Sequence, residues 1–366
     1  MSQLHKSNIP SLNGLRAFSV LLVAASHCGF GTIVPGGLGV TVFFFLSGFL
    51  ITMILRDEFT ARGTVDFRNF YIRRFFRLTP PFLTTLAFGV FLVFAHLLPG
   101  FVTLNAMLAQ VLYLANYYSI FWDPGHSIVA GTEVFWSLAV EEHFYFVYPV
   151  VLLALLRSAS NRTAWVVMGC MCVAVLTWRY GLVQSAGFSP ERTGYATDTR
   201  IDSILFGCIF ALATGATRLR NLPSISAWTA RGYLAVGVVM LLATVIVRDP
   251  VFRETWRYSI QGIALMPIFL AILSYQRGWV HGLLNLKIVD KLGEYSYAFY
   301  LVHFIIAKAL VFSGVPNGTI VLYALAVVLS YGYARALNIY VERPSKSMMR
   351  NLTKLTPALT NRALHV

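Results

Sequence analysis

The stretch that decides the fold is the first apolar run of the chain, which reads Leu15-Arg-Ala-Phe-Ser-Val-Leu-Leu-Val-Ala-Ala-Ser-His27. On an α-helix, the steps from Arg16 to His27 make three turns and about 20°, so both side chains share one face, about 16 Å apart. Charged and titratable groups are costly inside a bilayer and mark functional sites there. Because another apolar run follows without a clear cleavage site, we interpret this stretch as a retained signal anchor.

The composition of the whole chain is that of a polytopic membrane protein. Apolar residues make up 57% of the 366 residues, charged residues make up 12%, and the mean hydropathy is +0.67. Soluble domains of ordinary composition do not reach these values. The net charge of +14 invites a nucleic-acid interpretation, but its distribution follows the positive-inside rule. We therefore expect the lipid bilayer, and no nucleic acid, as a partner.

Apolar runs long enough to span a bilayer predict an all-α bundle of about ten transmembrane helices. They lie at 13–31, 37–55, 80–98, 134–156, 163–182, 201–217, 230–247, 258–275, 292–313 and 318–341. An eleventh run, 105–122, is interrupted by polar residues. If it does not cross, most Lys and Arg residues lie on one side, and if it crosses, this asymmetry collapses. We expect 105–122 to be re-entrant or interfacial and both termini to be cytoplasmic.

The domain organisation is simple. We predict one membrane domain, 1–344, and a basic cytoplasmic tail, 345–366, that is interfacial or disordered. The glycines between Gly36 and Gly48 are expected to serve a turn and close helix packing, and the four cysteines to pack as small hydrophobes. No His/Glu grouping has metal-ligand spacing, so no metal is predicted.

A basic cluster follows the second predicted span. It reads Asp66-Phe-Arg-Asn-Phe-Tyr-Ile-Arg-Arg-Phe-Phe-Arg-Leu-Thr-Pro-Pro81. On a helix, Arg73, Arg74 and Arg77 are spaced to form one guanidinium surface, which suits bidentate recognition of phosphate. Two interpretations remain open: a topogenic cluster that contacts lipid phosphates, or a binding site for a soluble phosphorylated cosubstrate.

The fourth predicted span carries a polar stripe. Its members, at i, i+4, i+8 and i+11, are Ser137, Glu141, Tyr145 and Tyr148, with Glu142 about 100° around the helix. Adjacent carboxylates within apolar sequence cannot all face lipid, which favours a functional site. The alternative is that Glu141 pairs with an arginine of another helix and only fixes packing.

Two further groups support a buried polar site. Asp198-Thr-Arg-Ile-Asp202 opens the sixth span, and Tyr297 and His303 lie in the ninth. The alternatives are a local ion pair between Arg200 and Asp202 and a hydrogen-bonded core role for His303.

In this order, the motifs resemble the acyltransferase-3 family of integral membrane O-acyltransferases, over roughly 10–344. The matching segments are Leu12 to Arg16 with His27, Gly39 to Ile51, Arg73 to Pro80, Trp136 to Tyr145, Thr199 to Asp202, and Ser296 to His303. By position, Arg16 and His27 correspond to the family's essential pair, and Arg74 and Arg77 to its CoA-binding motif. His143 departs from the usual Gln. The esterase-like domain of some relatives is not found here, so transfer is expected to finish within the membrane domain.

The resemblance implies transfer of an acyl group, most simply acetyl, from cytoplasmic acyl-CoA to a hydroxyl of a saccharide or lipid-linked glycan. The bacterial inner membrane is the expected location. Arg73, Arg74 and Arg77 would bind the CoA phosphates. His27 would act as general base or acyl carrier, and Arg16 would steer the donor. Glu141 or Glu142 would orient the imidazole or move its proton. The expected substrate-binding residues are Trp136, Tyr145, Arg200, Asp202, Tyr297 and His303.

A proton-coupled transporter or flippase of a saccharide or lipid-linked substrate is the alternative from another class. Buried Glu, His and Asp residues also form proton relays. This alternative does not explain the cytoplasmic arginine surface, and the sequence has no matched pair of broken helices. CoA binding that depends on Arg74 and Arg77 would separate the two.

Overall fold

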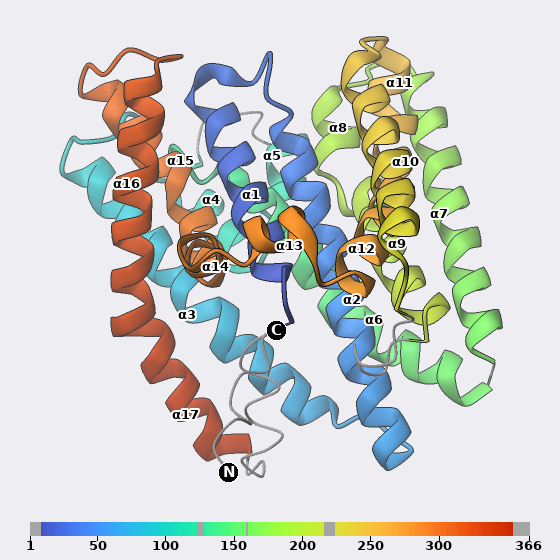
Figure 1. Cartoon of the computed structure of the whole chain (residues 1–366). Coiled ribbons are helices and arrows are strands. Elements are labelled where there is room, and N and C mark those ends of the chain that lie inside the picture. The colour runs from blue at the N-terminus through green and yellow to red at the C-terminus, as the bar shows by residue number, and fades with distance from the viewer. Residues whose placement is uncertain (1–8, 123–127, 159, 216–223, 354–366) are drawn as a thin grey trace.

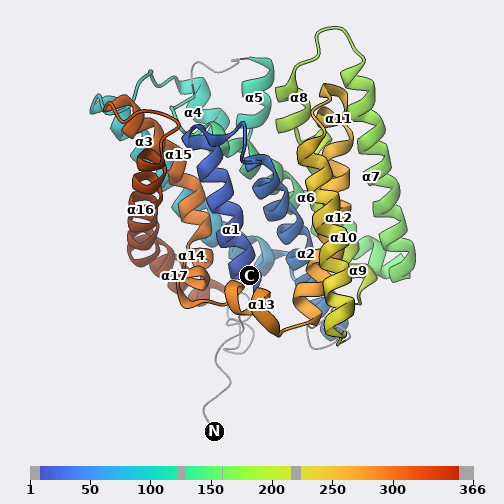
Figure 2. The same ribbon diagram turned by 45° about the horizontal axis from the view of Figure 1, so that its top comes forward.

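The computed structural model of the chain describes residues 9–122, 128–158, 160–215 and 224–353. These residues form helices and loops, with no strand among them. The long helices run side by side in one bundle, and short helices lie at its two ends (Figures 1 and 2).

The bounds of the helices follow in chain order. They are α1 (Leu12–Ala25), the π-helical turn η1 (Ser26–Phe30), α2 (Gly36–Arg62), α3 (Phe67–Phe94), α4 (Leu104–Val111), α5 (Ala115–Phe121), η2 (Glu133–Phe135), α6 (Trp136–Ser158), α7 (Asn161–Val183), α8 (Pro190–Tyr195), α9 (Thr197–Ala213), α10 (Ala227–Ile246), α11 (Pro250–Glu254), α12 (Trp256–Ser274), α13 (Gly278–Leu284), α14 (Lys287–Glu294), α15 (Ser296–Phe312), α16 (Ile320–Leu337), η4 (Asn338–Glu342) and α17 (Arg343–Thr353).

Seven helical segments of the described residues are long and apolar enough to cross a membrane. They are Gly36–Arg62, Phe67–Phe94, Glu133–Arg157, Arg162–Val183, Ala227–Ile246, Trp256–Ser274 and Ile320–Thr353. An eighth results if α14 and α15, which meet at 77°, count as one bent span. The predicted spans at 13–31 and 201–217 are helical, but α1 has 14 residues and α9 has 17. The protein is an all-helical, multi-pass membrane protein, and the count of ten stays a prediction.

The segment 105–122 folds as two short helices rather than one. Between α4 and α5, Tyr113 adopts a left-handed conformation with φ 56°. The two helices have 8 and 7 residues, which makes each about 12 Å long or less. Neither can cross the bilayer alone, in agreement with the predicted non-crossing segment.

The third helix starts earlier than the predicted span at 80–98. Asp66 caps it by accepting a hydrogen bond from the Asn69 amide at 3.0 Å, and α3 then continues through Pro80 and Pro81. Proline is more frequent in membrane helices than in soluble ones. The arginine cluster therefore lies on an extension of a long helix that could span the membrane, not in a loop.

The last helix likewise crosses the predicted boundary at residue 344. Through η4, α16 continues directly into α17, which packs against α3 and buries Met349. The first part of the predicted tail is thus helical as far as Thr353. Residues 354–366 lie outside the described part.

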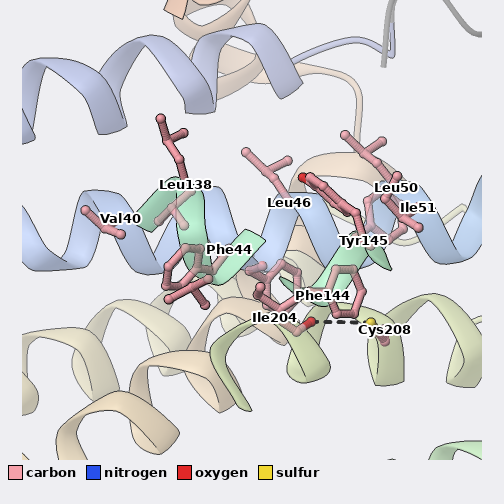
Figure 3. Close-up of a cluster of buried hydrophobic side chains, with 14 of the residues drawn as sticks. Val40, Phe44, Leu46, Leu50, Ile51, Leu138, Phe144, Tyr145, Ile204 and Cys208 are labelled. Atoms are coloured by element: carbon pink, nitrogen blue, oxygen red, sulfur yellow. Dashed lines mark hydrogen bonds between the residues drawn. The ribbon is translucent and has the colours of Figure 1, made fainter. Parts of the chain in front are cut away.

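The core is centred on α2, which contacts α9 more closely than ordinary side chains allow. Figure 3 shows core side chains of α2 beside those of α6 and α9. A Cβ atom at Gly48 would collide with the Ile204 carbonyl of α9, and one at Gly207 with the Phe45 carbonyl of α2. The predicted packing role of Gly48 is therefore confirmed.

The periphery of the bundle is apolar and exposed, as lipid contact requires. Val173 on α7, Val239 on α10 and Val328 on α16 are more than half exposed. Trp228 and Trp279 are exposed near helix ends, where indole rings favour the membrane interface. Of the cysteines, Cys28, Cys172 and Cys208 are buried as predicted, whereas Cys170 is exposed.

Candidate active site

A cavity opens between α1, α2, α3, α6 and the bent pair α14–α15. Its empty volume is about 800 Å³. Six predicted site residues line it: Arg16, Arg74, Arg77, Glu141, Tyr145 and Tyr297. We call this space the donor cavity, because the family resemblance predicts that Arg74 and Arg77 bind the acyl donor.

One end of the donor cavity is cationic. The Arg74 guanidinium carbon lies 4.7 Å from the centre of the Tyr145 ring. Arg16 donates to the Asn13 amide oxygen at 3.4 Å, which fixes its direction. Of the lining carboxylates, Glu294 is paired with Lys291 at 2.6 Å. The guanidiniums therefore keep capacity for an anion, and their planar donors suit phosphate oxygens.

Arg73 does not share this cavity, contrary to the predicted three-arginine surface. Its Nη2 lies 3.8 Å from Oε2 of Glu58 on α2, and it is not among the lining residues. The Glu58 carboxylate attracts this side chain away from Arg74 and Arg77. Helix α3 thus supplies two arginines to the cavity, and α1 supplies the third.

The polar stripe of α6 faces α2. Glu141 accepts hydrogen bonds from the Ser47 hydroxyl at 2.9 Å and the Tyr145 hydroxyl at 3.0 Å. Farther along, the Tyr148 hydroxyl lies 2.5 Å from that of Thr52. Glu141 is therefore held by hydroxyl groups. These contacts differ from the alternative prediction, in which Glu141 forms an ion pair with an arginine of another helix.

His27 pairs with His303, not with Glu141 or Glu142 as predicted. Nδ1 of His27 lies 2.9 Å from Nε2 of His303, and the His27 ring stacks on Phe304 with centroids 4.3 Å apart. The backbone stays helical through His27, and non-helical φ/ψ values begin at Cys28 and Gly29. Among the described residues, no hydrogen bond joins His27 to either glutamate.

Tyr300 connects the donor cavity to the two imidazoles. It lines the cavity, and its hydroxyl lies 2.8 Å from that of Ser137. Its ring centroid lies 5.5 Å from that of His303. His27 does not line the cavity; it contacts His303, which lies one turn of α15 from Tyr300.

The hydrogen bonds of His303 determine the tautomers of the pair. Nδ1 of His303 lies 2.7 Å from the Tyr300 carbonyl oxygen, which can only accept. In a neutral imidazole, Nε2 of His303 must then accept, so Nδ1 of His27 donates to it. Nε2 of His27 consequently carries the free lone pair. Sequence reasoning assigned His303 to substrate contact because no local signal relates it to His27.

Asp202 is not available to a substrate, which corrects the predicted assignment. It accepts from Arg179 at 2.9 and 2.7 Å and from Ser259 at 2.9 Å. Asp202 and Arg179 are both 0% exposed. The predicted ion pair between Arg200 and Asp202 is also replaced by this one. Arg179 was missed because it is a single basic residue in an apolar helix.

Two other predicted substrate residues lie apart from the donor cavity. Arg200 is 2% exposed and donates to the Thr41 hydroxyl at 3.2 Å. Trp136 stacks on Tyr195 with centroids 4.9 Å apart. His143, which stands where the family usually has Gln, contacts the Thr197 hydroxyl at 2.7 Å. These side chains belong to the end of the bundle opposite the arginines. In the described ranges, no group of three His, Cys, Asp or Glu residues is placed to hold a metal ion.

The fold and site define a class: a multi-pass helical membrane protein with an internal cationic cavity that leads toward paired imidazoles. Residues 9–335 match the model of the acyltransferase-3 family, described as an acyltransferase domain, so the chain belongs to this family.

Proteins similar to the chain are bacterial. The putative peptidoglycan O-acetyltransferase YrhL of Bacillus subtilis is 28% identical over 94% of this chain and 56% of its own length. The peptidoglycan O-acetyltransferase OatA of Listeria monocytogenes is 28% identical over 81% of this chain and 49% of its own. A putative O-acetyltransferase of Staphylococcus aureus is 26% identical over 88% and 54%. The chain spans about half the length of these curated relatives. No solved structure matches it.

Proposed function

We propose that this protein is an O-acyltransferase that moves an acyl group, most simply acetyl, from acyl-CoA to a hydroxyl of a cell-envelope saccharide or lipid-linked glycan. The observation that carries the proposal is the donor cavity, lined by Arg74, Arg77 and Tyr300, together with the contacts of Tyr300 with His303 and of His303 with His27. Family membership supports acyl transfer, and the names of two relatives support peptidoglycan as one candidate acceptor.

The donor cavity suits the two ends of an acyl-CoA. CoA phosphates would bind Arg16, Arg74 and Arg77, since guanidinium groups bind phosphate in a bidentate way. The walls between the arginines and Tyr300 are largely apolar and include Phe43 and Phe44, which suits an extended pantetheine arm. The thioester would then approach His27 from the Tyr300 side.

The tautomers support two roles for His27, and both use Nε2. As general base, it takes the proton of the acceptor hydroxyl while the oxygen attacks the thioester carbonyl carbon. The C–S bond breaks, and the departing thiolate receives that proton, so the products are an ester and CoA. As acyl carrier, Nε2 first attacks the thioester carbonyl carbon, the C–S bond breaks and CoA leaves as the thiolate. The acceptor hydroxyl then attacks the acyl carbon, the N–C bond to Nε2 breaks, and the hydroxyl proton passes to the thiolate. His303 holds the imidazole in the required tautomer in either case.

We place the arginine end of the bundle in the cytoplasm of a bacterial cell. Basic residues of α17 and α3, including Lys346 and Arg68, lie at that end, as the positive-inside rule requires. Acyl-CoA is a cytoplasmic metabolite, so the donor would enter there, and the acceptor would bind at the opposite end.

The test uses native host membranes, which contain their own acceptors, and acetyl-labelled acetyl-CoA. Base-labile ester label should appear with the wild type and be lost in His27→Ala at matched expression. Equal label in the two would defeat the assignment of His27. A transporter or flippase would form no ester bond, so the same measurement separates that alternative.

A further inference from the structure

A second cavity lies at the opposite end of the bundle from the donor arginines. Its walls are the loop 31–35, which follows η1, the first turn of α2, the end of α10, and α11 with the start of α12. Its empty volume is about 520 Å³. We call it the α11 pocket. Figure 1 shows the α1–α2 loop and α11 at the same, upper end of the bundle.

The α11 pocket is cationic. Arg248, Arg253 and Arg257 line it beside Tyr258 and Gln261, and none of the lining residues is acidic. Arg248 donates to the Thr32 carbonyl at 3.3 Å, which ties it to the loop after His27. Three guanidiniums around one opening form a site for an anion with several acceptor oxygens.

Of the three arginines, only Arg257 has a carboxylate within ion-pair distance among the described residues. Glu254 lies 3.9 Å from Arg257 and also accepts from the Thr193 hydroxyl at 2.6 Å. Asp249 accepts from the Phe252 amide at 2.7 Å and caps α11. Arg253 is exposed at the rim.

A buried cation behind the pocket adds to its positive field. The Arg200 guanidinium carbon lies 3.9 Å from the centre of the Tyr258 ring, and the side chain is 2% exposed. Its hydrogen bonds reach only neutral atoms, and its Nε has no partner. Asp202 is already held by Arg179 at 2.7 Å. A buried cation without a carboxylate of its own is costly, so a bound anion nearby is favoured.

We propose that the α11 pocket binds an oxyanion, a phosphate or a carboxylate, carried by the acyl acceptor. That the bound molecule is the acyl acceptor rests on the proposed function, whereas the anion site itself does not. Because Thr32 and its neighbours follow His27 directly in the chain, an anion held there anchors the acceptor beside the segment that positions the imidazole. The acceptor class is then a charged saccharide rather than a neutral one.

Binding is measured on the purified full-length chain in an Arg74→Gln/Arg77→Gln background, which weakens probe binding in the donor cavity. The probes are inorganic phosphate and glucuronate, with glucose and sodium chloride as neutral and ionic-strength controls. Both oxyanions should raise Tm saturably, and glucose should not. Adding Arg253→Gln/Arg257→Gln should remove the shift, whereas Arg231→Gln, an exposed arginine near the start of α10, should keep it. Equal shifts in all variants would overturn the site.

Transfer is measured in native membranes with labelled acetyl-CoA, on chains with an intact donor cavity. Arg253→Gln/Arg257→Gln should lower ester label about tenfold or more, with retention of acetyl-CoA unchanged and Arg231→Gln normal. Unchanged label would overturn the acceptor role. If the wild type forms no His27-dependent label while the oxyanion shift still depends on these arginines, the proposed function fails and the anion site stands.

A lipid headgroup is the other source of phosphate at this depth. Vesicles of phosphatidylcholine with and without phosphatidylglycerol distinguish it from an acceptor. Glucuronate binding should be equal in the two vesicles. If phosphatidylglycerol displaces glucuronate and the substitutions leave ester label unchanged, the pocket holds a lipid, and the acceptor assignment is overturned.

Discussion

His27 and His303 are 276 residues apart in the sequence, yet Nδ1 of one lies 2.9 Å from Nε2 of the other. The Tyr300 carbonyl, 2.7 Å from Nδ1 of His303, gives this contact its direction. A chain of two neutral imidazoles that ends on a carbonyl leaves one lone pair, on Nε2 of His27. In the proposed function, this lone pair makes His27 an oriented base or nucleophile, and His303 acts as a positioning residue.

Replacing His303 should separate orientation from packing. His303→Phe keeps a ring of similar size but removes the acceptor, so kcat should fall by about 100-fold. His303→Gln restores an acceptor oxygen and should recover part of that loss. The measurement is kcat and KM for acetyl-CoA, and KM should change little in both variants. A purely structural histidine would give the reverse order, with Phe tolerated and Gln damaging.

The α3 arginines offer a matched pair for donor binding. Arg77→Gln and Arg74→Gln each remove a guanidinium from the donor cavity and should raise KM for acetyl-CoA about tenfold, with kcat largely kept. Arg73→Gln, whose side chain pairs with Glu58, should change KM far less. Saturation kinetics at constant ionic strength measure this. A larger effect at Arg73 would mean that CoA binds outside the cavity.

Asp202 should behave as a structural residue. Asp202→Asn leaves Arg179 buried without its counterion, which costs about 3–5 kcal/mol of folding free energy. Thermal unfolding of the purified protein should show a large fall in Tm. Replacing the pair together, as Arg179→Met/Asp202→Leu, should recover most of the loss because no unpaired charge remains. A normal Tm with a raised acceptor KM would instead return Asp202 to the substrate site.

Local spacing explains which site residues were predictable. Glu141 and Tyr145 are one helical turn apart, and Arg74 and Arg77 are three residues apart, so periodicity alone places each pair on one face. The donor cavity contains all four. The orientation of Arg73 depends on Glu58 of α2, a tertiary contact that no spacing within α3 encodes.

Long-range pairings and helix continuity were not predictable in the same way. Arg179 reaches Asp202 only because α7 packs on α9, and His27 reaches His303 only because α1 lies beside α15. Helix α3 begins at Phe67, before the predicted span at 80–98, and continues through Pro80 and Pro81, although proline usually ends or kinks a helix. The two pairings have the same origin: a partner distant in sequence decides the outcome.

The glycines of the α2–α9 crossing give the last prediction. A Cβ at Gly48 would meet the Ile204 carbonyl and one at Gly207 the Phe45 carbonyl, and backbone atoms cannot move aside as a flexible side chain can. Gly48→Ala or Gly207→Ala should therefore force the two helices apart and cost about 1–3 kcal/mol. Gly169 of α7 is the control, since a Cβ there meets nothing within 4 Å, and Gly169→Ala should be neutral or gain up to about 1 kcal/mol of helix propensity. Tm of the purified variants measures both.

The same two variants should also lose affinity for acetyl-CoA, because α2 supplies Phe43, Phe44 and Ser47 to the donor cavity. A normal Tm and a normal affinity in Gly48→Ala would show that this crossing is looser than the packing requires.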